Sequence, residues 1–258
     1  NNNKINNISI DKTGLLKFSK SKTNLMNGGI YYFKKEIFKY IKNKKISLEN
    51  EIIKKLIYEK KIKGHFFNNK FIDIGSKKNL NFAMKNPNFF KQNAFFLDRD
   101  GVINRLIKND YVRNIKQFKF LPGVFEALKF LNNNNYIVII ITNQACVGKL
   151  IISEKKLNSI HTFMTNEIKK KDAKIDDIFY SPYYKNSKIK KYRVGLNDRK
   201  PNPGMLIKAI NKWNLNINKS FFIGDSPSDM SVSKKVNLKF FYKTKESLIN
   251  QVRNIILK

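Results

Sequence analysis

Carboxylates stand directly after two short apolar segments of this chain. Asp98 and Asp100 follow one segment, and Asp225 and Asp229 follow the other. Like charges gathered in one place repel one another, so we expect a cation among them. Carboxylate oxygens suit Mg²⁺, which also binds the phosphate groups of substrates. The acids therefore indicate a magnesium site that handles phosphorylated molecules.

The Asp-x-Asp spacing allows two carboxylates to do different work. Asp98 and Asp100 lie two residues apart at the end of an extended segment, so one can present a nucleophilic carboxylate while the other reaches round the following turn as a proton donor. Thr142 ends another apolar segment and offers a hydroxyl to a phosphoryl oxygen. Arg199 and Lys200 precede a predicted helix and would bring positive charge to the same place.

The elements that must position these residues alternate between strand and helix from Ala94 onward. The run Tyr136–Ile141 is apolar at every position, which is typical of a strand buried on both faces of a parallel sheet. We expect strands at 94–97, 136–141, 178–180, 221–223 and 238–242, and helices at 124–131, from Ser153 onward, and at 203–213, 230–235 and 246–256. This alternation predicts an α/β fold with a Rossmann-like, doubly wound parallel sheet. Ligands of such sheets bind at the carboxyl ends of the strands, so the chemical residues should meet at one edge.

The first part of the chain has a different rhythm. Short strands are predicted at 8–10, 30–33 and 71–74, and helices at 36–41 and 48–58. Pro87 interrupts whatever helix precedes it. We therefore predict two domains, with residues 1–88 in the first and residues 89–258 in the second.

The charge of the chain is interpreted as a general compositional bias that places lysines on solvated surfaces. There are 52 Lys and Arg residues against 19 acids, a formal net charge of +33. Nucleic-acid binding is the alternative that this charge suggests. However, the lysines are spread along the whole chain, and only a few of the basic residues are the arginines that base recognition favours. A positive field of this kind would also attract phosphorylated small molecules.

Cysteine usage and hydropathy narrow the setting. Cys146 is the single cysteine, which excludes an intramolecular disulfide and suits a reducing compartment. The longest apolar run is far shorter than the roughly 18–20 residues that a membrane span needs. The first residues have no signal-peptide pattern. We therefore expect a cytoplasmic protein that has no membrane partner.

Four motifs, in order, resemble the signature of the haloacid dehalogenase superfamily of phosphatases. They are Asp98-Arg99-Asp100-Gly101, Thr142-Asn143, Lys200, and Asp225 with Asp229. The resemblance implies a fold without a large cap domain, and an aspartyl-phosphate formed on Asp98. It also implies that Asp100 protonates the leaving oxygen and then activates water, and that Thr142, Arg199 and Lys200 hold the phosphoryl group. Mg²⁺ would be bound by Asp98, the Asp100 backbone carbonyl and Asp225, while Asp229 would act through a water or cap the following helix.

Longer stretches resemble the D-glycero-D-manno-heptose 1,7-bisphosphate phosphatase branch, which histidinol-phosphate phosphatases partly share. They are 98–104, 111–112, 118–124, 142–144 and 199–205. This likeness implies hydrolysis of the 7-phosphate, with histidinol phosphate or another sugar phosphate as the alternative substrate. The substrate-binding residues it implies are Asn109, Asp110, Tyr111, Asn143, Gln144, Arg199 and Lys200. Where this branch often carries a zinc loop, the chain has no thiolate or imidazole at 181–184 or 196–198, so no zinc is expected.

The first domain resembles the C-terminal part of a sugar nucleotidyltransferase. The matching stretches are 27–31, 47–51 and 71–76, and the likeness makes Asp73 a metal ligand. The Gly-rich nucleotide loop of that family is missing, so we expect no nucleotidyl transfer by this chain alone. A complete protein that joined both steps would be a bifunctional heptose 1-phosphate guanylyltransferase and phosphatase.

Overall fold

The computed structural model describes residues 8–21, 23, 25–41, 45–67 and 71–257. The chain divides into two compact units, Asn1–Asp73 and Ile74–Lys258. The domain boundary predicted between residues 88 and 89 falls inside η3, a 3-10 helix at Pro87–Phe90. None of the helices in the described ranges has the length and apolar character of a membrane span.

The N-terminal unit holds a small hairpin and a helical segment. Strand β1 (Ile8–Ile10) pairs in antiparallel fashion with β2 (Leu16–Phe18). The 3-10 helix η1 covers Lys35–Tyr40, and the π-helix η2 (Leu48–Ile53) continues into α1 (Lys54–Tyr58). Five apolar residues stand at helical spacing in 48–58; Leu48 is partly buried, and the other four are buried: Ile52, Ile53, Leu56 and Ile57.

Two strands predicted in the first part of the chain are wrong. Residues 30–33 belong to no strand, and Ile30 and Tyr32 are 91% and 94% exposed. Residues 71–73 lie in neither helix nor strand, and residues 74–75 form a turn. Aromatic and β-branched residues favour a strand only where a pleated, half-buried surface receives them. Most side chains at these positions have no such surface to pack on, and strand propensity alone does not form a strand.

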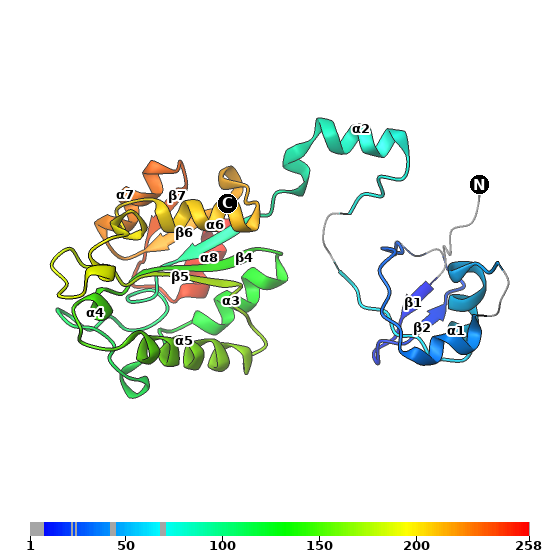
Figure 1. Ribbon diagram of the computed structural model, residues 1–258, viewed down its shortest axis with the longest axis horizontal. Coiled ribbons are helices and arrows are strands. Elements are labelled where there is room, and N and C mark those ends of the chain that lie inside the picture. Colours follow the sequence, from blue (N-terminus) through cyan, green and yellow to red (C-terminus); the bar gives the residue numbers. More distant parts are fainter. Residues whose placement is uncertain (1–7, 22, 24, 42–44, 68–70, 258) are drawn as a thin grey trace. The chain divides into compact units, whose positions relative to one another are not determined.

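Five parallel strands form the sheet of the C-terminal unit, in the order β5-β4-β3-β6-β7 (Figure 1). The strands are β3 (Ala94–Leu97), β4 (Ile137–Asn143), β5 (Asp177–Ser181), β6 (Phe221–Gly224) and β7 (Lys239–Tyr242). The α-helices are α2 (Lys77–Lys85), α3 (Val124–Asn133), α4 (Ala145–Gly148), α5 (Glu154–Lys169), α6 (Gly204–Trp213), α7 (Pro227–Lys235) and α8 (Leu248–Ile256). Single 3-10 turns are η4 (Ile115–Gln117), η5 (Lys190–Tyr192), η6 (Leu196–Asp198) and η7 (Ile217–Lys219). The predicted doubly wound α/β sheet is confirmed.

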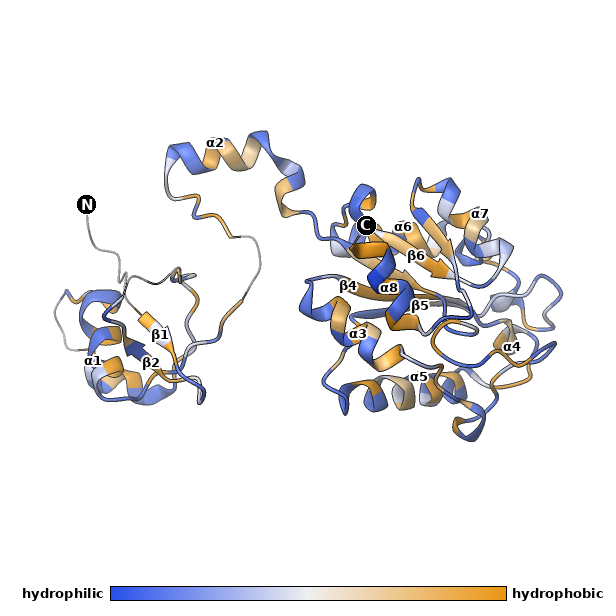
Figure 2. Ribbon diagram, turned by 180° about the vertical axis from the view of Figure 1, so that it is seen from behind, coloured by the Kyte–Doolittle hydropathy of each residue, from blue (hydrophilic) through white to orange (hydrophobic). Residues whose placement is uncertain are grey.

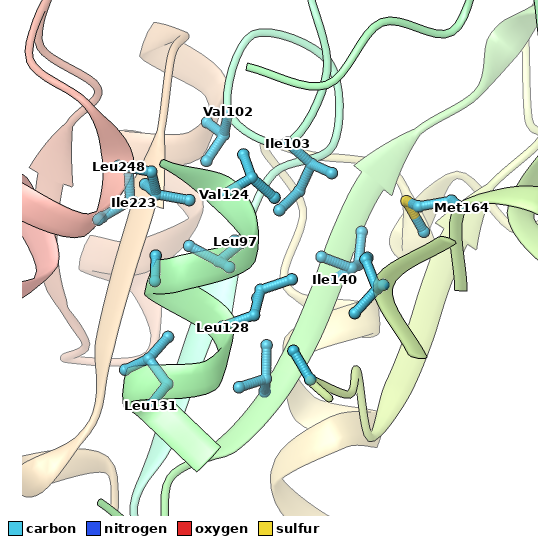
Figure 3. Packing of buried hydrophobic residues seen from close by; sticks show 14 of the residues in the cluster. Leu97, Val102, Ile103, Val124, Leu128, Leu131, Ile140, Met164, Ile223 and Leu248 are labelled. Carbon is cyan, nitrogen blue, oxygen red and sulfur yellow. The ribbon is translucent and has the colours of Figure 1, made fainter. Parts of the chain in front are cut away.

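Helices cover both faces of the sheet (Figure 2), and residues of the central strands enter a hydrophobic core on each face. Because neighbouring residues of a strand point to opposite faces, Phe95 and Leu97 enter one core and Phe96 enters the other. The first core is closed by α3, α5 and α8. Figure 3 shows side chains of α3 and the sheet interlocking in it, with Leu128 beside Ile140. The second core is closed by α6 and α7.

The chain order places a switch point at the centre of the sheet. From β3 the chain adds β4 and then β5 on one side, and then crosses back to add β6 and β7 on the other. Crevices form at such switch points, beyond the carboxyl ends of the strands. Leu97, the last residue of β3, lies opposite Ile140 of β4 and Ile223 of β6. The polar residues that follow these three strands therefore meet.

Candidate active site

Three carboxylates converge beyond the ends of β3 and β6. Oxygen atoms of Asp98, Asp225 and Asp229 all lie within 4.8 Å of one another. Asp98 is 7% exposed and Asp229 is fully buried, whereas Asp225 is half-buried. Within the described residues, this is the group of three acidic side chains with the spacing of a metal site. The convergence predicted from the strand ends is thus present.

Lys200 places a buried ammonium among these acids. Its Nζ lies 3.0 Å from Asp98 Oδ1 and 2.5 Å from Asp229 Oδ1, and it donates a hydrogen bond to the Ile141 carbonyl at 2.8 Å. The buried ammonium therefore has two carboxylates and one carbonyl as its close polar neighbours. Burial opposes the charged form of Lys200, but the carboxylates of Asp98 and Asp229 outweigh it and raise its pKa.

Asn143, at the end of β4, fixes the segment that carries this lysine. Its Nδ2 donates to the Lys200 carbonyl at 3.0 Å, and its Oδ1 accepts from the Lys200 amide at 3.0 Å. The neighbouring Thr142 is buried, and its Oγ1 accepts a hydrogen bond from Gln144 Nε2 at 2.9 Å. The polar end of β4 therefore orients both a hydroxyl and the loop at residue 200.

Asp100 is held by a fork of donors. Arg99 Nη2 lies 2.8 Å from Asp100 Oδ2 and 3.0 Å from Oδ1. Gln144 Nε2 donates to Oδ2 at 2.7 Å, and Asn104 Nδ2 donates to Oδ1 at 2.9 Å. Burial alone would raise the pKa of Asp100, but the Arg99 charge and these hydrogen bonds together lower it.

Two glycines allow the acids to approach. Gly101 has φ +87°, the left-handed region that side chains rarely adopt, and a Cβ there would overlap the Asp225 carboxylate. A Cβ on Gly224 would meet the Asp229 side chain. Asp229 also forms a capping box with Ser226 at the start of α7, so the helix-capping role considered from the sequence is present.

Crowding of negative charge changes the titration of two acids. Burial raises the pKa of Asp98 to about 7, the Lys200 ammonium opposing this rise and Asp229 adding to it. Burial and the neighbouring Asp229 likewise raise the pKa of Asp225 to about 6. Carboxyl groups that resist ionisation beside one another provide an electrostatic reason to bind a cation there.

These residues open into a cleft of about 160 Å³. Its walls include most of the side chains predicted from the sequence: Asp98, Asp100, Asp110, Tyr111, Thr142, Asn143, Lys200 and Asp225. They also include Val112, from the matched stretch 111–112, together with Leu106, Ile107, Ser226 and Ser228, which the sequence analysis did not single out. Ser226 follows Asp225 directly and Ser228 precedes Asp229, so their position between the two motif acids was the available signal.

Three predicted substrate-binding residues do not line the cleft, although their neighbours do. Gln144 is fully buried and serves Asp100 and Thr142. Asn109 has φ +59°, and Arg199 donates to the Tyr183 carbonyl at 3.3 Å. Their roles toward a substrate stay predictions.

The segments that replace the zinc loop are packed by aromatic rings. A Cβ on Gly195 would meet the ring of Tyr183 between 2.5 and 2.9 Å, so the ring lies directly on this glycine. Lys149 Nζ lies 5.2 Å from the centre of the Tyr184 ring. In the first unit, Asp73 is not part of the acidic group described above, and the nucleotidyltransferase likeness of residues 1–88 stays a prediction.

The sequence of the chain is similar to those of known proteins. Its residues 91–246 match the polynucleotide kinase 3 phosphatase family. The D-glycero-beta-D-manno-heptose-1,7-bisphosphate 7-phosphatase of Rhodopseudomonas palustris is 34% identical over 165 residues, covering 64% of this chain and 91% of that protein. The D-glycero-alpha-D-manno-heptose-1,7-bisphosphate 7-phosphatase of Campylobacter jejuni is 36% identical over 148 residues, covering 57% of this chain and 80% of that protein.

A solved structure supports the fold. The D,D-heptose 1,7-bisphosphate phosphatase of B. bronchiseptica, complexed with magnesium and phosphate, superposes with a TM-score of 0.55 at 21% identity. The match covers 64% of this chain and 98% of that one. The fold expected from the motifs, that of the haloacid dehalogenase superfamily, is therefore confirmed. With more than half of its length matched, the chain belongs to the polynucleotide kinase 3 phosphatase family.

Proposed function

We propose that residues 89–258 form a Mg²⁺-dependent phosphatase that removes the 7-phosphate of D-glycero-D-manno-heptose 1,7-bisphosphate. The observation that carries the proposal is the cluster of Asp98, Asp225 and Asp229 around Lys200, in a cleft at the switch point of the sheet. The names of the relatives from R. palustris and C. jejuni supply the substrate. They differ in the anomer, so the proposal does not choose between the α and β forms.

The acidic group fits a magnesium ion. Its oxygens converge, its carboxyl pKa values are raised, and a hard cation prefers such ligands. Asp229 is engaged by Lys200 and by the cap of α7, so Asp98, Asp225 and the Asp100 carbonyl are the proposed direct ligands, with Asp229 acting through a water. When bound, the ion would offset the negative charge of the phosphoryl group.

Asp98 is the proposed nucleophile. One carboxylate oxygen forms a bond to phosphorus as the bond from phosphorus to the sugar oxygen breaks, which gives an aspartyl-phosphate. The Lys200 ammonium, 3.0 Å from Oδ1, favours the ionised form of Asp98 and fixes its orientation. It would also balance charge that the phosphoryl group brings into the cleft.

Asp100 is the proposed acid and base. It would protonate the departing sugar oxygen and then take a proton from the water that hydrolyses the aspartyl-phosphate. Its lowered pKa suits the second step, in which a carboxylate must accept a proton. In the first step, the negative charge of an arriving phosphate would raise the pKa of the neighbouring carboxyl and favour its protonation.

The remaining walls of the cleft are proposed to bind the substrate. Thr142 and Asn143 stand at the end of β4 beside Asp98 and would contact phosphoryl oxygens. Asp110 and Tyr111 line the cleft together with Ile107, in the segment proposed to contact the sugar. Arg113 pairs with Asp110 at 2.8 Å and so orients this carboxylate.

Phosphate release from a panel of substrates tests the proposal. The panel contains both anomers of heptose 1,7-bisphosphate, histidinol phosphate and a nucleoside monophosphate, each assayed with Mg²⁺ and with a chelator. We expect release from heptose bisphosphate only with Mg²⁺, leaving the sugar 1-phosphate. Faster release from histidinol phosphate would favour the alternative substrate. Equal rates with chelator present would contradict the role of the acidic group.

A further inference from the structure

Among the residues that the structure describes, Arg99 heads the large side chains that are fully buried, and the proposed reaction gives this charged group no role. Arg99 is 0% exposed although it lies between two catalytic candidates. Its Nη2 contacts both oxygens of Asp100 and also lies 2.9 Å from Gln144 Oε1. One guanidinium therefore fixes the carboxylate and also the amide that itself donates to that carboxylate.

The other terminal nitrogen of this guanidinium, Nη1, contacts a histidine of helix α5. His161, on α5, is buried, and its Nε2 lies 3.1 Å from Arg99 Nη1. A guanidinium can only donate hydrogen bonds, so Nε2 must accept and the ring proton must sit on Nδ1. Burial and the Arg99 charge lower the pKa of His161 to about 3, in keeping with a neutral ring. The Tyr180 ring packs edge-on against the imidazole, 5.5 Å away between centres.

We propose that His161 is a positioning residue: by accepting from Arg99, it holds the guanidinium in the register that orients the Asp100 carboxylate toward the cleft. This inference rests on the proposed function through the role given to Asp100. Without the acceptor, the buried Nη1 loses a partner, and the fork is free to turn away from Asp100. Small displacements of a catalytic group lower turnover while leaving much of the substrate contact intact.

Paired substitutions separate this role from packing. His161→Leu removes the acceptor, and His161→Gln keeps an acceptor oxygen on a side chain of similar reach. Met164→Ala lies one turn further along α5, is buried in the core and serves as a destabilised control. We expect kcat for heptose bisphosphate to fall about tenfold or more in the Leu variant with KM little changed, and to recover in the Gln variant. The control should keep the parent kcat below its unfolding temperature.

The opposite pattern would overturn the proposal. If His161→Leu kept the parent kcat while His161→Gln lost it, position 161 would need only an apolar side chain and no acceptor. If Met164→Ala lost as much kcat as His161→Leu, the lower kcat would come from lost stability. An aryl phosphate is assayed in parallel, because absence of turnover of both substrates by the parent protein contradicts the proposed function itself.

A spectroscopic readout tests the contact without any substrate. The chain has two histidines, so ring ¹⁵N spectra of the parent and of His65→Gln identify the signals of His161. We expect the neutral form with the proton on Nδ1 at pH 7, and a change of that signal in Arg99→Lys. A ring protonated at Nε2 would contradict the contact and overturn the positioning role.

Discussion

Replacing Lys200 with methionine tests the electrostatics of the site in depth. The substitution keeps a long side chain but removes the ammonium that lies 3.0 Å from Asp98 and 2.5 Å from Asp229. Breaking a buried pair by removing one partner costs about 3–5 kcal/mol because a charge is left uncompensated. For a unit of this size each kcal/mol lowers Tm by about 2–4 °C, so we expect a fall of about 6–20 °C at pH 8.

Thermal unfolding at pH 8 and pH 5, with and without Mg²⁺, measures this effect. At pH 5, protonation of Asp98 should neutralise the charge that the lost ammonium balanced. At pH 8, bound Mg²⁺ should balance it instead. Each condition should therefore reduce the difference in Tm between the variant and the parent protein. Lys208→Met is the matched control, because Lys208 pairs with Asp198 through a side chain that is 61% exposed. Such a surface pair contributes about 0–1 kcal/mol. Equal shifts in the two variants at pH 8 would refute the compensating role of Lys200.

Three further predictions address backbone, metal and thiol. Gly101→Ala should weaken Mg²⁺ binding and destabilise the protein by more than the roughly 1–2 kcal/mol of left-handed strain, because the new Cβ overlaps the Asp225 carboxylate. Gly29→Ala, at φ +68° with open space around the new Cβ, is the control that measures the strain alone. Equal losses of stability in chemical denaturation would be evidence against the overlap. The pKa of Asp98 is raised from 3.8 to about 7, so the metal-free folded state holds a proton that the unfolded chain releases, and its stability should fall as pH rises through that window. Mg²⁺ needs the ionised carboxylates, so its stabilising effect in calorimetry should grow over the same range; an effect that shrinks from pH 5.5 to 8 would exclude these ligands. Burial raises the pKa of Cys146 to about 11, so a chromogenic disulfide should label it in denaturant but not in the native protein, and rapid native labelling would show an accessible thiol.

The sheet could be predicted because its information is local. Continuous apolar runs such as Ile137–Ile141 identify buried parallel strands, and the rule for switch points then brings Asp98 and Asp225 together. The strands expected at 30–33 and 71–74 failed for the opposite reason. A strand needs a partner and a surface, and neither is visible in a short stretch of aromatic residues.

The support of Asp100 lay beyond what the sequence could show. The contact between Arg99 and His161 joins residues 62 positions apart. His161 falls on the buried stripe of α5 with Leu157 and Met164, which predicts burial but gives no partner. For Arg99, the available signal was its place between two aspartates. The packing of α5 against the sheet is what brings Arg99 and His161 together, and neither local pattern shows it.

The most direct test of the account is phosphate release by Asp98→Asn. The asparagine keeps the size of the side chain but cannot form the aspartyl-phosphate, and its fold can be checked by circular dichroism. We predict that the parent protein releases phosphate from heptose 1,7-bisphosphate with Mg²⁺ present, and that the folded variant loses this activity by at least about 1,000-fold, since removal of a nucleophile leaves only binding and electrostatic contributions. Release at the parent rate by Asp98→Asn would contradict the central claim.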